Sequence, residues 1–216
     1  MPETTADTTP VQQPETTAPA QTQTVPAETV DVYDLCDELQ INRIDSYVGI
    51  YMEDGTDDVV SGILMISVTN ESDRDLQLAR INLAYPDAVA QFEVTNLPAG
   101  ATVTLLEKNR MEMPDQAPVS SSVENLLFFP EPMDLQQERI QLGGSTGMLT
   151  VSNISGEDID GDIYVYYKNT SGDQFYGGIT FRAKVSGGLK AGETATLMAN
   201  HYAPDSCTVV LVETLD

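Results

Sequence analysis

The sequence predicts an all-β protein in which two small β-sandwich domains follow a disordered, Thr/Pro-rich stalk. Three observations lead to this prediction. From residue 31 onward, β-branched and aromatic runs alternate with Gly, Asn, Asp and Pro clusters, as in sandwiches and barrels. Two groups of turn residues occur twice in that region. Residues 1–30 contain nine Thr and five Pro but no aromatic or basic residue.

The composition of residues 1–30 predicts an extended spacer. Such a stretch buries too little apolar surface to offset the entropy of ordering its backbone, so we expect it to be disordered. Thr/Pro-rich tracts of this kind serve as stalks between an anchor and a folded head. The chain opens on Met-Pro-Glu, without a basic and apolar leader. We therefore expect an export signal or anchor, if the protein has one, to lie upstream of this chain.

Residues 31–216 carry nine segments whose composition and alternation favour strands. In the clearest of them, Ile163, Val165 and Tyr167 share one face while Tyr164 and Tyr166 share the other. The nine are Val59–Thr69, Leu76–Tyr85, Gln91–Val94, Thr102–Leu106, Gly147–Ser152, Ile163–Lys168, Ile179–Val185, Thr194–Met198 and Thr208–Glu213. A helix signal occurs only near residue 35, where four residues have the spacing of one or two amphipathic turns: Val32, Leu35, Cys36 and Leu39.

An internal repeat divides this region. The segment from Asn70 to Ser72 reads Asn-x-Ser after a strand, and so does Asn153 to Ser155, 83 residues later. Leu-x-Ala-Gly turns end at Gly100 and at Gly192, an offset of 92 residues rather than 83. The second copy therefore has a longer middle, around residues 169–178. We predict a first sandwich over 31–115, a Pro/Ser-rich linker over 116–123 and a second sandwich over 124–216.

The order of these motifs resembles FxLYD-type and related immunoglobulin-like domains of bacterial surface proteins and lipoproteins. The second copy, from Gly147 to Glu213, matches better than the first, and Tyr166-Tyr167-Lys168-Asn169 stands near where the Phe-x-Leu-Tyr-Asp motif would fall. The resemblance implies two immunoglobulin-like sandwiches outside the cytoplasm, without known catalytic residues. The stalk similarly resembles the tether that follows the lipid-bearing cysteine of bacterial lipoproteins.

Charge and composition exclude several function classes. A formal net charge of -24 disfavours binding to nucleic acid or anionic lipid, so we expect membrane attachment only through an N-terminal anchor beyond this chain. One His leaves little for a metal site, and we expect no cofactor.

Residues 143–147 satisfy Gly-x-Ser-x-Gly, but a strand follows Ser145 where a nucleophile elbow needs a helix. His201 is the only His available as a base, and no pattern positions it. We therefore expect no enzyme.

Two acidic turns offer carboxylates to Ca²⁺, but neither has EF-hand spacing, and the alternative, which we favour, is a solvated acidic turn without a metal. They lie at residues 54–58 and 158–162. Four aromatic residues are a candidate platform for sugar rings, with strand packing as the alternative: Tyr164, Tyr166, Phe175 and Tyr176. The two cysteines, Cys36 and Cys207, allow a single disulfide, with two separate thiols as the alternative.

These observations together predict a non-catalytic, surface-tethered interaction or scaffold module of a bacterium, attached to the cell envelope. Its expected partner is an extracellular protein or a glycan. The alternative is an accessory domain that binds carbohydrate or peptide.

Overall fold

The computed structural model describes residues 31–215, and this part of the chain is all-β, as predicted. The prediction of a disordered stalk over residues 1–30 lies outside the described residues. The thirteen strands are β1 (Asp34–Cys36), β2 (Leu39–Ile50), β3 (Val59–Asn70), β4 (Leu76–Ala84), β5 (Val89–Leu97), β6 (Thr102–Leu106), β7 (Ser120–Phe128), β8 (Ile140–Ser145), β9 (Met148–Asn153), β10 (Asp162–Ser171), β11 (Gln174–Val185), β12 (Thr194–Met198) and β13 (Cys207–Leu215).

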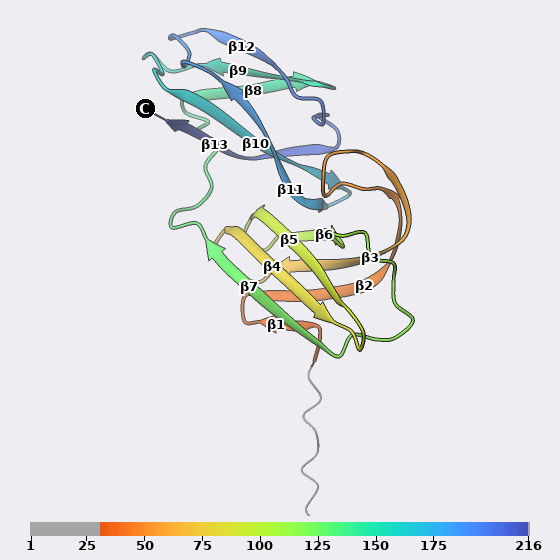
Figure 1. The fold of residues 1–216 in the computed structure, drawn as a ribbon. Helices are drawn as coiled ribbons and strands as arrows, with labels where there is room; N and C mark the ends of the chain where they lie inside the picture. The colour runs from red at the N-terminus through yellow and green to blue at the C-terminus, as the bar shows by residue number, and fades with distance from the viewer. Residues whose placement is uncertain (1–30, 216) are drawn as a thin grey trace, which may run out of the picture.

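The strands form two groups, which we call the first half (residues 31–128) and the second half (residues 129–215). In the first half, β1-β2-β3-β6 lie beside one another in one sheet and β5-β4-β7 form another. In the second half, β12-β9-β8 form a separate sheet, whereas β11-β10-β13 lie beside one another at the far end of the sheet that contains β1-β2-β3-β6. The order of β2, β3 and β6 thus corresponds to that of β8, β9 and β12, and the order of β5, β4 and β7 to that of β11, β10 and β13. Figure 1 shows the first half below the second.

Each half has its own apolar core, formed where the alternating side chains of its strands face inward. The first core includes Leu64, Ile81 and Phe92, and the second includes Val151, Val165 and Tyr202. No buried cluster of the described residues merges the two. The two cores are therefore distinct, and we call the contact between the halves the junction.

A parallel strand pair joins the two halves. Phe175 and Tyr176 of β11 lie in register with Val103 and Thr104 of β6, so β11 extends the sheet of the first half. The result is one seven-stranded sheet, in the order β1-β2-β3-β6-β11-β10-β13, that runs through both halves. Phe175 also packs against the first core although it belongs to the second half.

The two Asn-x-Ser segments make the same hydrogen bonds. The buried Asn70 side chain donates to the Arg74 carbonyl at 2.8 Å and accepts from the Ser72 hydroxyl at 2.7 Å. The buried Asn153 side chain donates to the Glu157 carbonyl at 2.8 Å and accepts from the Ser155 hydroxyl at 2.6 Å. Both Asn residues end a strand, and each side chain holds the following turn against its sheet.

The structure differs from the sequence predictions in three places. Of the four residues with helical spacing, Leu35 and Cys36 lie in β1 and Leu39 begins β2, while Val32 lies in the turn before β1, so no helix forms. Leu39 pairs with Asn70 and enters the first core. The segment predicted as a linker, 116–123, overlaps β7, which pairs with β4, so the strands of the first half extend to Phe128. β2 and β8 were not among the predicted strands.

Candidate functional site

The contact between the halves is the most chemically distinctive place in the described chain. It is built by the segment that makes the second copy longer, because the end of β10 and the start of β11 reach across to the first half. From the first half, the loop between β2 and β3, residues 51–58, reaches in the opposite direction. Tyr51 fixes this loop by donating to the Lys108 carbonyl at 2.8 Å. Arg110 holds its acidic residues, at 2.8 Å from Asp54 and 2.9 Å from Asp58.

Lys168 of β10 is completely buried in this junction. Its ammonium group donates to the carbonyl oxygens of Thr95, Gly178 and Ile179, each at 2.9 Å. One of these carbonyls belongs to β5 of the first half and two belong to β11 of the second. Three carbonyl acceptors match the three N–H donors of a charged lysine, so the side chain acts as a tie between the halves.

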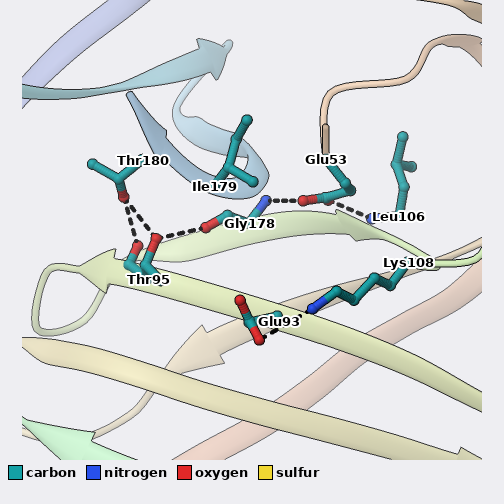
Figure 2. Close-up of a pocket in the computed structure, with 8 residues that line it drawn as sticks. All are labelled: Glu53, Glu93, Thr95, Leu106, Lys108, Gly178, Ile179 and Thr180. Carbon is teal, nitrogen blue, oxygen red and sulfur yellow. Dashed lines mark hydrogen bonds and ion pairs between the residues drawn. The ribbon is translucent and has the colours of Figure 1, made fainter. Parts of the chain in front are cut away.

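Glu53 binds the same place from the loop of the first half. Its carboxylate accepts from the backbone N–H of Leu106 and from that of Gly178, both at 2.8 Å. Gly178 therefore donates to Glu53 through its N–H while its carbonyl accepts from Lys168. A Cβ at Gly178 would collide with the carbonyl oxygen of Glu93, so only glycine permits this close approach of β11 to β5. Figure 2 shows Glu53 between Leu106 and Gly178.

Burial changes the proton affinity of both charged groups. Desolvation raises the pKa of Glu53 to about 7, although the two backbone N–H donors and Lys168 favour its charged form. Desolvation lowers the pKa of Lys168 to about 7, and the charge of Glu53 opposes that change. The three carbonyls around Lys168 support the ammonium form in the folded protein.

A cavity of about 260 Å³, lined by both polar and apolar groups, adjoins the junction. Its walls include Glu93, Lys108 and two threonines, Thr95 and Thr180, whose hydroxyl oxygens are 2.9 Å apart. Glu93 accepts from Arg80 at 2.7 Å and from Lys108 at 3.3 Å, and the latter pair is visible in Figure 2. Each of these polar groups has a partner within the protein, and the pair of threonines is the one among them that crosses between the halves.

A second contact between the halves surrounds His201. Its ring stacks on Phe181 with centroids 4.5 Å apart, and its Nδ1 lies 3.5 Å from the Asp57 carboxylate of the first half. Gly55 lies beside the same two rings. The loop 51–58 thus contacts the second half at both Glu53 and Asp57. Two separated contacts resist a relative rotation that a single contact would permit.

The candidate aromatic platform is divided between two places. Tyr164 and Tyr166 are neighbours, with ring centroids 6.5 Å apart, and Arg182 lies over the Tyr164 ring at 4.9 Å. Phe175 and Tyr176 lie at the junction, where Tyr176 packs beside Tyr47 with centroids 5.8 Å apart. Tyr176 and Phe175 lie opposite Asn169 and Thr170 of β10, so the two pairs are separated along the sheet by about 10 to 20 Å at about 3.3 Å per residue.

Other candidate residues from the sequence have structural partners. Cys36 and Cys207 are free thiols that pack against the first and second core, respectively, so the considered disulfide is not formed. Ser145 ends β8 and pairs with Met148 in the hairpin to β9, and its hydroxyl has no hydrogen bond to His201 among the described residues.

The acidic turns are also held internally. In the second turn, Lys190 lies 2.9 Å from Asp158 and Lys184 lies 2.6 Å from Asp162. In the first turn, Arg110 pairs with Asp54 and Asp58. Within residues 31–215, no group of three or more His, Cys, Asp or Glu side chains gathers as metal ligands would.

Comparison with known proteins found no matching family model, curated protein or solved structure for this chain. In the described part of the chain, no helix is long and apolar enough to cross a membrane.

Sequence reasoning missed Glu53 and Lys168, whose charged groups bind backbone groups of both halves at the junction. Lys168 continues the spacing of Tyr164 and Tyr166, so period-two alternation places it on the outward face of its strand. It is buried because it lies at the junction, where carbonyls of β5 and of β11 surround its ammonium group. The sequence signal for the junction is the longer middle of the second copy, around residues 169–178. The length of that segment does not show which part of the protein the segment contacts.

Proposed function

We propose that this protein is a non-catalytic, surface-tethered interaction or scaffold module of a bacterium. In this proposal its head consists of two immunoglobulin-like sandwiches in tandem. The tandem arrangement is supported by the corresponding strand order of the two halves and by the shared hydrogen bonds of Asn70 and Asn153. The FxLYD-like resemblance noted in the sequence agrees with both.

The observation that carries the proposal is the tie at Lys168, with its three carbonyl partners from both halves. A junction held by a buried charge and by a shared sheet keeps two units in one orientation. Such rigidity is useful to a module that must present a surface at a set place, because it lowers the entropy lost when a partner binds. The residues that suggested chemistry from the sequence are instead engaged in turns and packing.

Fractionation of the source cells tests this proposal. The protein is expected to sediment with the cell envelope. Protease added to intact cells is expected to release a folded head that begins near residue 31, as detected by mass spectrometry. A cytosolic marker enzyme serves as the control for cell integrity. A protein that remains in the cytosol and resists external protease would refute the surface location.

A serine-directed covalent probe tests the absence of catalysis separately. Ser145 is expected to stay unlabelled in the native protein and in the His201→Ala variant alike. Stoichiometric labelling of Ser145 that disappears in the His201→Ala variant would instead identify an enzyme.

A further inference from the structure

The two halves differ at one sheet edge. In the first half, β1 covers the outer edge of β2 and also contacts β7 of the opposite sheet. It thereby closes one side of the sandwich. Leu35 and Cys36 of β1 fill this side by packing against the first core.

The second half has no strand in the corresponding place. Leu39 of β2 pairs with Asn70, and Ile140 of β8 pairs with Asn153, so these two positions correspond. β8 is the outermost strand of its sheet. The chain that precedes β8 turns to the opposite sheet instead. There the backbone carbonyl of Asp134 accepts from the backbone N–H of Val212 at 2.8 Å.

An open apolar groove of about 590 Å³ lies at this edge. Its lining comes from β8, from the segment before β8, from the residue that follows β9 and from β13, and includes Leu135, Ile140, Leu142, Ile154 and Val209. Ile154 is 51% exposed although it is a large apolar side chain. The groove therefore leaves apolar surface in water that the first half covers with β1.

The backbone at this edge matches the pattern that β1 uses. The N–H of Ile41 donates to the Tyr33 carbonyl beside β1 at 2.8 Å, and Leu142 is the corresponding residue of β8. The N–H of Ile140 already points away from β9, since it donates to Gln136 at 2.8 Å. Residues two apart in a strand direct their N–H groups to the same side, so the N–H of Leu142 also faces the groove.

We propose that this edge of β8 binds an extended, basic peptide segment of a partner protein. The segment would add to β8 as an antiparallel strand, as β1 adds to β2, and place alternate apolar side chains in the groove. The basic character follows from the net charge of -24, which repels an acidic strand and attracts a cationic one. This inference rests on the proposed function as an interaction module and specifies its partner class.

The probe is a fluorescent synthetic peptide of eight residues with the apolar spacing of residues 31–38. It carries lysine at each acidic position of that segment and alanine in place of its cysteine. Titration of the full chain, followed by anisotropy, is expected to give saturable one-to-one binding. A scrambled peptide of the same charge is expected to bind at least about tenfold more weakly, because it can lose both the strand hydrogen bonds and the apolar fit.

Two variants locate the binding site, and a third serves as their control. Ile154→Asn removes apolar lining, and Leu142→Pro removes the N–H that faces the groove, which an edge strand tolerates. Each is expected to weaken binding by about tenfold. Met198→Asn changes an exposed residue of β12, outside the groove, and is expected to leave the affinity unchanged.

Three outcomes would overturn the proposal. The first is equal binding of the scrambled peptide, or no loss in either groove variant. The second is a dimer of the full chain in sedimentation that Ile154→Asn abolishes, which would identify a second copy as the occupant. The third is tighter peptide binding after deletion of residues 1–30, which would identify the protein's own N-terminal segment. Because these are measurements on the purified chain, they remain decisive even if fractionation refutes the surface location.

Discussion

Replacement of Lys168 by Met tests whether the buried ammonium holds the two halves together. Met keeps most of the length and apolar volume of the side chain but cannot donate to the three carbonyls. Two of those carbonyls keep a second donor, since Thr180 donates to the Thr95 carbonyl at 3.1 Å and Thr95 donates to the Gly178 carbonyl at 3.1 Å. The variant therefore loses three charge-assisted hydrogen bonds without leaving every acceptor unpaired.

The expected loss in the free energy of unfolding is about 2–4 kcal/mol. Removal of one member of a buried polar network costs about 3–5 kcal/mol. The two threonine hydroxyls and the relief from desolvating an ammonium group reduce that figure. Glu53 adds to the loss, because its carboxylate would remain buried without the positive charge that now favours its charged form.

Urea denaturation followed by tyrosine fluorescence measures this loss, and Lys190→Met is the matched control. Lys190 pairs with Asp158 at 2.9 Å, but its side chain is 71% exposed, so its removal is expected to cost less than about 1 kcal/mol. If Lys168→Met and Lys190→Met differ by less than about 1 kcal/mol, the junction does not depend on the buried lysine.

Three further predictions concern the junction and the Asn-x-Ser turns. Glu53 has a folded-state pKa of about 7, above its ordinary 4.5, so folding favours its protonated form. As pH rises from about 4.5 to about 7, the wild type should therefore lose stability relative to Glu53→Gln. Parallel pH–stability curves of the two proteins would contradict this. Gly178→Ala should force β11 away from β5 and lower the melting temperature by several degrees, at roughly 2–4 °C per kcal/mol lost. The control Gly156→Ala should leave the melting temperature unchanged, because a Cβ there meets nothing within 4 Å. Equal melting temperatures of the two variants would refute the close-approach argument. Asn70→Ala and Asn153→Ala should each lower the free energy of unfolding in urea by about 2–3 kcal/mol, because each removes a buried hydrogen-bonding group. The control Asn42→Ala, at an exposed position, should lower it by less than about 1 kcal/mol. A small loss in either buried variant would show that its turn does not depend on the Asn side chain.

The all-β class was predictable because β-branched and aromatic alternation reports directly on strands that bury one face. The missed strands lack that signal. β2 carries Asn42, Arg43 and Asp45 in its centre, β7 begins with three serines, and β8 contains two glycines. Tertiary pairing with a neighbouring strand decides such segments, and sequence patterns do not report it.

The functional surfaces were less predictable than the fold, for a different physical reason. Burial of Glu53 and Lys168 depends on how the two halves meet, and the alternation within one strand contains no information about a second unit. The helix predicted near residue 35 failed similarly. Its apolar spacing fits a helix face, but Leu35 and Cys36 reach the first core only when the segment extends along β2.

The two outer strands of the sheet β12-β9-β8 in the second half are not equivalent as binding edges. β12 has an unpaired outer edge, yet its side chains alternate between exposed and half-buried, and none of its residues lines the groove beside β8. The edge of β8 adjoins the groove lined by Leu142 and Val209, so a strand added there gains both backbone hydrogen bonds and apolar burial. The first half shows the value of that combination, because β1 obtains both at β2. A partner strand that requires both is therefore expected to choose β8 over β12.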